Sequence, residues 1–354
     1  MTKIFLTGAT GYIGGDFLAT LRKSHPEFEV ISLIRSETQK APIQSQLPGV
    51  HVVVGDLDNS DLIEKHSREA DIVVNLATSN HIKSVQAIRT IPSWSGDLDN
   101  ISGTLVQISG GSILSYAEIQ SGAYGESSDL VLDDVRDIST IRKLTKEHPK
   151  RVVDGYLLSL ASERVKTAIV CPPCIYGNGE GPVHQRSMQI PDLANATLRE
   201  SHGLVPGAGL SRWSTVNIRD LSTLFVKLVE HAAANNFQNG AWGADGYYLP
   251  INGEKSWGDI AKLITQSAYD QGFNKTLDLV TADKKKADEI TPSGSVLYGI
   301  NARFGSTRAQ KFLGWSPVEE SVEASIAAAI EQEAADLGIK PNQKKNSALN
   351  VEKL

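Results

Sequence analysis

The chain has 354 residues, of which 40% are apolar and 21% charged, and its formal net charge at pH 7 is -6. This length suits one large domain with a smaller second lobe, and the apolar content is enough to bury a sizeable core. The mildly acidic balance gives no electrostatic indication of binding to nucleic acid or to an anionic membrane, so neither is expected as a partner and small molecules are.

Cysteine usage and hydropathy indicate the compartment. The only two cysteines, Cys171 and Cys174, lie too close in sequence to link distant parts of a fold, which indicates reducing conditions. No apolar stretch approaches the length of a membrane span, and the first apolar run starts too early to leave room for a signal peptide. We therefore expect a cytoplasmic protein that is a monomer or a homodimer.

The first 172 residues alternate short β-branched runs with longer helical patterns, which is typical of βαβ units in a parallel sheet. The runs are nearly continuous in apolar residues, as expected for strands covered on both faces. The six predicted strands are Lys3–Leu6, Glu29–Ile34, Val50–Val54, Ile72–Leu76, Thr104–Ile108 and Lys166–Val170. Amphipathic helices are predicted between them, and the clearest begin near Gly11, near Asp58 and at Lys150–Arg164.

The pattern changes after Cys171-Pro172-Pro173, where glycine, proline and polar loops separate three further helical stretches. These stretches are Arg219–Ala234, Ser256–Gly272 and Pro317–Leu337. They predict a smaller lobe, although the first of them is also suited to packing against the sheet. The polar, aperiodic residues 341–354 predict a disordered tail.

A glycine-rich loop joins the first predicted strand to the first predicted helix, with the sequence Thr7-Gly8-Ala9-Thr10-Gly11-Tyr12-Ile13-Gly14. Gly8 permits a tight turn, Gly11 lets the backbone approach a pyrophosphate, and Gly14 lets the helix pack close to the strand. Free N–H groups at the start of the helix would face the anion. Because strand, loop and helix follow in the required order, the loop predicts a dinucleotide site.

This loop resembles the Thr-Gly-x-x-Gly-x-x-Gly loop of the extended and atypical short-chain dehydrogenase/reductases, which include NAD-dependent epimerase/dehydratase-like proteins. The resemblance implies a doubly wound parallel-sheet Rossmann domain over residues 1–177, completed by residues 213–235. A C-terminal substrate lobe would then cover residues 178–340. It also implies a nicotinamide cofactor.

Further segments resemble cofactor contacts of that family. The second strand ends at Arg35, with no acidic residue where an acceptor for the adenosine 2′-hydroxyl would sit, and a guanidinium there suits a 2′-phosphate, so NADP(H) is favoured over NAD(H). Asp56 and Leu57 resemble the adenine contact. The remaining segments implied at the cofactor are Leu76, Ala77 and Thr78 after the fourth strand, and Pro172, Pro173 and Ile175 after the sixth.

The family's usual catalytic pair, a tyrosine four residues before a lysine, is absent from the sequence. Ser112 matches the family's catalytic serine, and Ser109 competes for that role. Lys150 falls near the position of the lysine, where it would bind the nicotinamide ribose, but the tyrosine position then holds Lys146. Tyr116 and Tyr176 are alternative proton donors, because geometry and not sequence order assigns such roles.

Loops between the sheet and the predicted lobe carry candidate substrate residues. His184, Arg212 and Trp213 fall there, and an arginine beside a tryptophan suits an acidic or planar group. The Cys171-Pro172-Pro173-Cys174 segment follows a strand and does not open a helix, so a disulfide-exchange role is not predicted. No histidine cluster supplies the further ligands of a zinc site, and no metal is expected.

Three functions fit these patterns. The first is an NADP(H)-dependent oxidoreductase acting on a small carbonyl or hydroxyl compound, with a proton donor other than the usual tyrosine. The second is a catalytically silent NADP-binding regulator, which the missing tyrosine and lysine favour. The third is an isomerase or cyclase that uses the same pocket without net hydride transfer.

Overall fold

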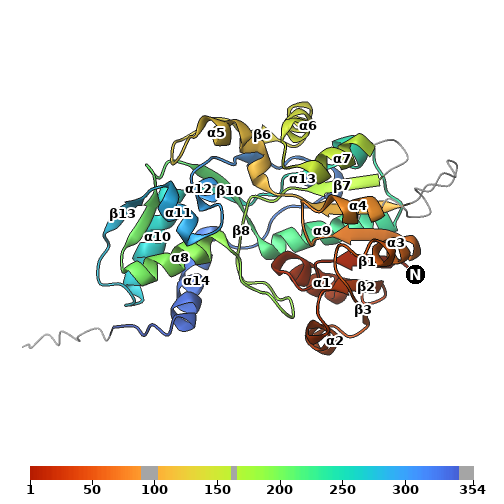
Figure 1. Ribbon diagram of the computed structural model, residues 1–354, viewed down its shortest axis with the longest axis horizontal. Helices are drawn as coiled ribbons and strands as arrows, with labels where there is room; N and C mark the ends of the chain where they lie inside the picture. Colours follow the sequence, from red (N-terminus) through yellow and green to blue (C-terminus); the bar gives the residue numbers. More distant parts are fainter. Residues whose placement is uncertain (89–102, 161–165, 343–354) are drawn as a thin grey trace, which may run out of the picture.

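The computed structural model describes residues 1–88, 103–160 and 166–342. The largest feature of this part of the chain is a parallel sheet of seven strands (Figure 1). In order across the sheet they are β11 (Tyr247–Tyr248), β7 (Lys166–Val170), β5 (Thr104–Ile108), β4 (Ile72–Asn75), β1 (Lys3–Thr7), β2 (Glu29–Ile34) and β3 (Val50–Val54). The strand order reverses between β1 and β4, so a crevice is expected where these two strands end.

Side chains of the central strands alternate between two hydrophobic cores. In β1, Ile4 and Leu6 belong to one core and Phe5 to the other. In β4, Val74 belongs to the core that contains Ile4, and Val73 belongs to the core that contains Phe5. Successive side chains of a strand point to opposite faces, so both faces of the sheet are buried. This confirms the predicted doubly wound α/β class and explains the nearly continuous apolar runs in the sequence.

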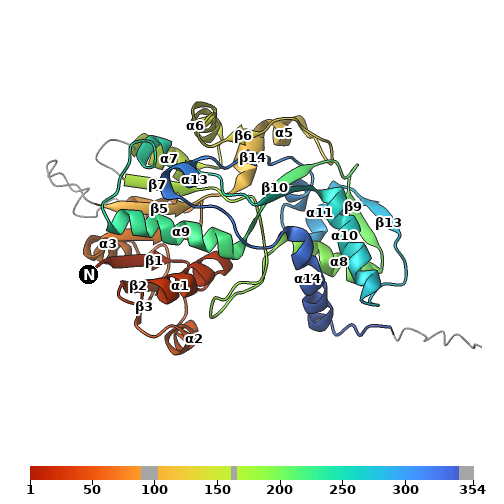
Figure 2. The same ribbon diagram turned by 180° about the vertical axis from the view of Figure 1, so that it is seen from behind.

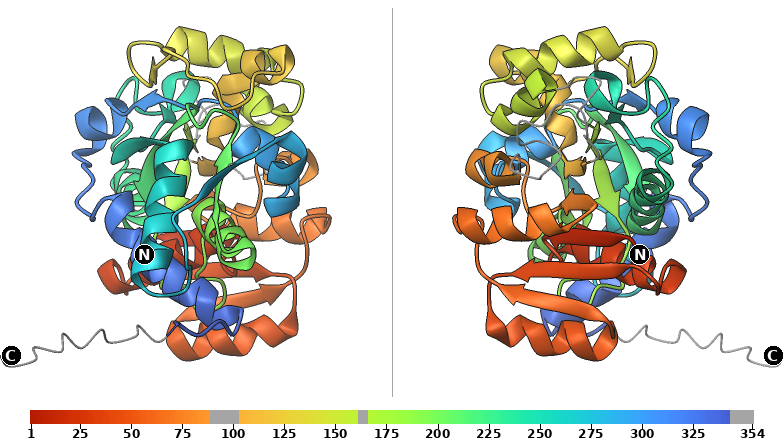
Figure 3. Two further views of the ribbon diagram at one scale, coloured as in Figure 1. Left: turned by 90° about the vertical axis from the view of Figure 1, so that its left-hand side faces the viewer. Right: turned by 90° about the vertical axis from the view of Figure 1, so that its right-hand side faces the viewer.

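Helices cover both faces of the sheet (Figure 3). On one face, α1 (Tyr12–Ser24) and α9 (Ile218–Ala233) lie side by side, as Figure 2 shows. The other face is covered by α3 (Ser60–Glu69), α4 (Ile82–Ile88) and α7 (Val152–Leu160), whose apolar side chains share a core with Phe5. The helix predicted over Arg219–Ala234 therefore packs on the sheet, far in sequence from the strands that it covers.

The rest of the described chain forms smaller sheets and a helical layer beside the large sheet (Figure 1). The strand β10 (Arg212–Asn217) lies between a parallel neighbour, β8 (Cys174–Tyr176), and an antiparallel one, β12 (Gly253–Ser256). The helices α8 (Gln189–Glu200), α10 (Trp257–Asp270) and α14 (Val322–Asp336) pack against one another. Shorter elements are α2 (Lys40–Gln46), α5 (Tyr116–Ser121), β6 (Leu132–Asp133), α6 (Ile138–Glu147), β9 (Gly203–Pro206), β13 (Leu279–Ala282), α11 (Lys284–Ile290), α12 (Gly294–Leu297), β14 (Phe304–Gly305) and α13 (Arg308–Leu313).

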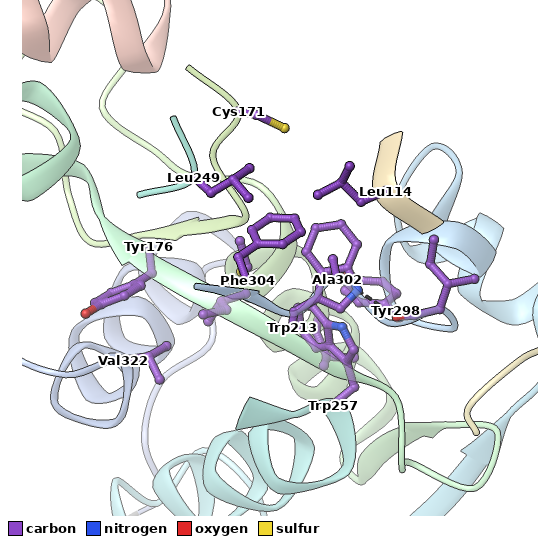
Figure 4. Close-up of a cluster of buried hydrophobic side chains, with 14 of the residues drawn as sticks. Leu114, Cys171, Tyr176, Trp213, Leu249, Trp257, Tyr298, Ala302, Phe304 and Val322 are labelled. Atoms are coloured by element: carbon purple, nitrogen blue, oxygen red, sulfur yellow. Dashed lines mark hydrogen bonds between the residues drawn. The ribbon is translucent and has the colours of Figure 1, made fainter. Parts of the chain in front are cut away.

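Aromatic side chains join β10 to this helical layer (Figure 4). The ring centroids of Trp257 and Tyr298 lie 4.7 Å apart with an edge-on angle of 79°, an arrangement that aromatic pairs prefer. Trp213 is buried beside them, and its Nε1–H donates to the carbonyl oxygen of Ile300 at 2.7 Å. These residues belong to the same hydrophobic core as Phe5 of the large sheet, so the two parts of the chain share one core.

Most predicted elements occur close to their predicted bounds. Four strands, β2, β3, β5 and β7, match fully, whereas β1 extends to Thr7 and β4 ends at Asn75. The strand β11 was not predicted, because two residues carry no periodic signal. The helix predicted from Lys150 begins at Val152, and its residues 161–165, like residues 343–354 of the predicted tail, lie outside the described part of the chain. Among the described helices, none combines the length and apolar character needed to cross a membrane.

Candidate functional site

The glycine-rich loop lies at the end of β1, beside the point where the strand order reverses. Gly8 has a φ of +84°, and a Cβ atom there would lie 2.5 Å from the carbonyl carbon of Leu76. A Cβ atom on Gly14 would lie 2.1 Å from the carbonyl oxygen of Gly8. Since real Cβ atoms do not approach so closely, both positions require glycine, and the loop, the neighbouring strand end and α1 pack backbone against backbone.

The start of α1 is open toward the sheet edge. Its N-cap residue is Gly11, which has no side chain to bind the first N–H groups of the helix. The Gly11 N–H itself donates to the Gly8 carbonyl oxygen at 2.9 Å and closes the turn. Uncapped N–H groups at a helix start attract anions, and here the surrounding glycines leave space for one.

Polar side chains tie together the strand ends beneath this loop. The Thr7 hydroxyl donates to Asn75 Oδ1 at 2.5 Å, and Asn75 Nδ2 donates to Gln107 Oε1 at 2.8 Å. Gln107 Nε2 then donates to the carbonyl oxygen of Thr78 at 3.1 Å. This chain of hydrogen bonds links the ends of β1, β4 and β5 beneath the site. Gln107 was not predicted from the sequence, where it stands as one polar residue inside an apolar strand.

Two cavities open along this edge of the sheet and meet at the loop. The first has a volume of about 490 Å³, and the second has a volume of about 410 Å³. Both are lined by Gly11, Leu76 and Ala77, so they form one continuous groove. Of the predicted cofactor contacts, the first cavity brings together Thr7, Gly8, Thr10, Gly11, Arg35, Asp56, Leu57, Leu76, Ala77 and Thr78. Tyr12, Ile13, Pro172, Pro173 and Ile175 line the second cavity, whereas Gly14 packs behind the loop.

The first cavity carries the charged groups of the groove. Arg35 is exposed at the end of β2, and Asp56 lies across from it after β3. One Asp56 carboxylate oxygen accepts the N–H groups of Asp58 and Asn59 at 2.9 and 3.1 Å, which fixes the turn into α3. His184, predicted at the substrate, lines this cavity and not the second one.

The second cavity is closed on one side by the Ser109–Ser112 segment after β5. Both serines line it. The Ser112 hydroxyl oxygen accepts a hydrogen bond from Arg151 Nη2 at 3.0 Å, and the same nitrogen donates to the Gly110 carbonyl oxygen at 3.0 Å. The Ser109 hydroxyl instead donates to Oδ2 of Asp154, a side chain that is fully buried.

The buried Asp154 carboxyl group has few hydrogen-bond partners and a raised pKa. The Tyr247 hydroxyl donates to the same Oδ2 atom at 3.3 Å, and Oδ1 has no hydrogen-bond partner among the described residues. Burial raises the pKa of Asp154 to about 6, and the hydrogen bond from Ser109 and the charge of Arg151 only partly oppose that rise. A carboxyl group that changes charge near neutral pH thus lies one hydroxyl away from the second cavity. No sequence pattern indicated this carboxyl group, because the contact joins residues 45 positions apart.

Apart from the two serines, none of the predicted catalytic residues lines the second cavity. Tyr116 is half-buried and its ring packs against His148, with centroids 4.6 Å apart. Lys150 is exposed in the turn before α7, and it is the next residue, Arg151, that turns inward. Tyr176 is fully buried, and its hydroxyl donates to the Glu320 carbonyl oxygen at 2.6 Å.

The predicted substrate residues are held by neighbouring groups. Arg212 Nε donates to Glu254 Oε1 at 2.7 Å, so its guanidinium is paired. Trp213 borders the second cavity but is buried, with its indole N–H bound to the backbone. Cys171 and Cys174 are buried free thiols, and burial raises the pKa of each to about 12, which makes them poor nucleophiles. In the described ranges, no three His, Cys, Asp or Glu side chains gather as a metal site would require.

Known proteins resemble this chain in sequence and in fold. Residues 1–89 match the NmrA-like family. A protein named oxidase ucsJ from Acremonium sp is 35% identical over 352 residues, which cover 95% of this chain and 99% of that protein. An isoflavone reductase homolog, A622 of Nicotiana tabacum, is 37% identical over 81 residues, 21% of this chain and 25% of its own length.

Among solved structures, a dTDP-glucose 4,6-dehydratase from Bacillus anthracis in complex with NAD superposes with a TM-score of 0.63. The superposition covers 95% of this chain and 97% of that one. Because the sequence identity is 14%, it supports the fold alone. The full-length relative carries the family assignment, and the glycine-rich loop at the carboxyl edge of the sheet agrees with it. The chain belongs to the extended and atypical short-chain dehydrogenase/reductases, an oxidoreductase family of the NAD(P)-binding Rossmann superfamily.

Proposed function

We propose that the chain is an NADP(H)-dependent oxidoreductase that interconverts a small carbonyl compound and its alcohol. One observation supports this function above all, namely the continuous groove across the ends of β1 and β4. Its first cavity, its uncapped helix start and its second cavity follow one another as the adenosine, the pyrophosphate and the nicotinamide do along the cofactor.

The first cavity fits an adenosine that carries a 2′-phosphate. Arg35 stands at the end of β2, where proteins of this fold that bind NAD place an acidic residue. Its planar guanidinium can bind two phosphate oxygens at once. Leu33, Ile34 and Leu57 supply apolar surface for the adenine ring. This arrangement favours NADP(H) over NAD(H).

The second cavity fits the nicotinamide and an uncharged substrate. Its lining includes Pro172, Pro173, Met188 and Leu297, and none of the described lining residues carries a charge at neutral pH. Burying a charged group there would cost free energy without a partner to offset it. A small aldehyde, ketone or alcohol with an apolar body is therefore the expected substrate class.

The bound nicotinamide would supply or take up the hydride, and the chain would orient the reactants and stabilise developing charge. Ser112 is suited to the second task. Its oxygen accepts a hydrogen bond from the Arg151 guanidinium, which leaves the hydroxyl proton free to donate to a substrate oxygen. The guanidinium charge behind it strengthens that donation as negative charge grows on the oxygen.

Calorimetric titration of the full chain with NADPH and with NADH tests this function. Wild type should bind NADPH more tightly than NADH. Gly11→Val should abolish binding, because the valine side chain would occupy the space where loop and pyrophosphate meet. Its thermal melt should still show a cooperatively folded protein, since Gly11 has a φ of -80° that any residue adopts and an added Cβ atom would lie 3.3 Å from the Gly8 carbonyl oxygen, a tight contact that a small shift relieves. Absence of binding of either nucleotide to the folded wild type would refute the proposal.

A catalytically silent NADP-binding regulator is the second candidate. It is favoured by the positions of Tyr116, Lys150 and Tyr176, none of which lines the second cavity. A screen of small uncharged aldehydes, ketones and alcohols separates the two functions. Tight nucleotide binding with turnover supports the oxidoreductase, whereas tight binding with discrimination between NADP and NADPH and no turnover supports the regulator.

A further inference from the structure

On the proposed oxidoreductase function, a substrate oxygen must gain a proton when its carbon gains a hydride. The second cavity is lined by one phenol, that of Tyr12, but its hydroxyl donates to the Gly177 carbonyl oxygen at 2.6 Å. Burial and the nearby Asp16 carboxylate also raise the Tyr12 pKa well above its usual value, so this phenol is a poor acid. Among the described lining residues, the hydroxyls of Ser109 and Ser112 are left to deliver the proton.

The groups behind the two serines differ in what they can supply. Behind Ser112 lies the Arg151 guanidinium, which keeps its proton at any physiological pH and can only stabilise charge. Behind Ser109 lies the Asp154 carboxyl group, which can both hold and release a proton. Only Ser109 therefore connects the cavity to an internal proton reservoir.

The surroundings of Asp154 keep both of its charge states accessible. Arg151 from the start of α7, Ser109 from the end of β5, Tyr247 from β11 and Cys171 from the end of β7 face it. The Arg151 guanidinium donates hydrogen bonds to Ser112, Gly110 and Ser79, and it forms no ion pair with Asp154. The Asp154 carboxyl group thus has no salt bridge that would keep it ionised, but it has polar neighbours that can stabilise its charged form.

We propose that Ser109 and Asp154 form a proton relay that takes the place of the missing catalytic tyrosine. In the direction of carbonyl reduction, the substrate carbon gains a hydride from the cofactor, and the carbon–oxygen π bond breaks. The substrate oxygen takes the proton of the Ser109 hydroxyl, and the Ser109 oxygen takes the proton of neutral Asp154. Asp154 is left as a carboxylate, and once the product has left it regains its proton through Ser109 from water that enters the cavity. Alcohol oxidation runs the same transfers in reverse.

A purely structural role accounts poorly for an aspartate at this position. A buried carboxylate without an ion-pair partner costs stability, and its Oδ1 atom has no hydrogen-bond partner among the described residues. An asparagine would accept the Ser109 hydrogen bond without burying a charge. A buried carboxyl group next to a cavity is a recurrent feature of sites that move protons.

The relay is tested first without cofactor or substrate. Infrared difference spectra of the full chain, titrated between about pH 4 and about pH 8, report the carbonyl stretch of each neutral carboxyl group across this pKa range. Wild type should show a band that Asp154→Asn removes and that Ser109→Ala shifts in frequency. Asp134, whose pKa burial also raises to about 6, should give a second band in every variant and serves as the internal reference.

The control is Ser115→Ala, because Ser115 lies three residues after Ser112, is about as buried as Ser109, and donates to the Asn301 carbonyl oxygen away from the cavity. This variant should leave the Asp154 band at its wild-type frequency. A titrating band that survives Asp154→Asn unchanged, or an Asp154 band that Ser109→Ala does not shift, would overturn the relay.

Turnover provides the second readout. The kcat/KM of wild type for carbonyl reduction should fall about tenfold for each pH unit above about 6, because Asp154 then loses its proton. Asp154→Asn and Ser109→Ala should lower kcat about 100-fold or more, remove this pH dependence and leave NADPH affinity unchanged. Variants that keep both the rate and the pH profile would overturn the relay while the oxidoreductase function stands. A wild type that binds no NADPH would overturn the function, and the infrared titration would still decide whether Ser109 and Asp154 share a proton.

Discussion

Replacing Asp154 by asparagine should change how the stability of the protein depends on pH. The carboxyl pKa is 3.8 in an unfolded chain and about 6 in the folded protein, because burial disfavours the charged form. The folded state therefore holds more protons than the unfolded state between these two values, and the free energy of unfolding falls as pH rises through this window. The difference between the two pKa values corresponds to about 3 kcal/mol.

Asp154→Asn has no proton to lose at this position, so the free energy of unfolding of the variant should improve relative to wild type by about 2 kcal/mol between about pH 4 and about pH 7, because the unfolded carboxyl group is already more than half ionised at pH 4. Any packing or hydrogen-bond cost of the asparagine is the same at every pH and cancels in this comparison. Urea denaturation of both proteins at several pH values measures it. A gap between variant and wild type that stays constant with pH would refute the assigned environment of Asp154.

Three further changes test other parts of the structure. Arg35→Ala should weaken NADPH binding about tenfold, as expected for one exposed charge-assisted contact, and should leave NADH binding unchanged; calorimetry measures both, and equal weakening of the two would place the 2′-phosphate elsewhere. Arg136→Ala, which removes an exposed arginine paired with its own neighbour, is the control and should change neither affinity. Gly14→Ala should yield little folded protein by thermal melting, because its Cβ atom would clash with the loop backbone at 2.1 Å; a wild-type melting temperature would contradict the close packing of α1. Arg186→Ala should lower the free energy of unfolding in urea by about 3 kcal/mol, because it leaves the buried Glu333 carboxylate without its ion-pair partner. A loss below about 1 kcal/mol would show that the pair contributes as weakly as an exposed one.

The cofactor-binding part of the candidate groove could be predicted from the sequence because its residues lie in short continuous segments. The glycine-rich loop, Arg35 and the Asp56 turn each combine a strand end with the residues that follow it, and neighbours in sequence remain neighbours in space. Apolar runs between turn residues identified the strands for the same reason. Periodicity and spacing are properties of short segments, so they also predicted the doubly wound class.

The residues proposed to carry out the reaction at the second cavity could not be identified from their positions in the sequence. Ser109, Asp154 and Tyr247 come from three separate elements, and they meet only because β5, β7 and β11 are neighbours in the sheet and α7 packs across them. The position of the family's lysine falls near Lys150 in the sequence, whereas the turn before α7 points Arg151 inward instead.

The amino-acid sequence by itself determined the fold class and the family, and it predicted a place for the nucleotide, since each depends on local patterns of glycine, apolar and charged residues. Only the tertiary structure decided which polar side chains share the second cavity. Burial changes both the contacts and the proton affinity of a residue such as Asp154, and burial is a property of the packed chain and not of any single segment.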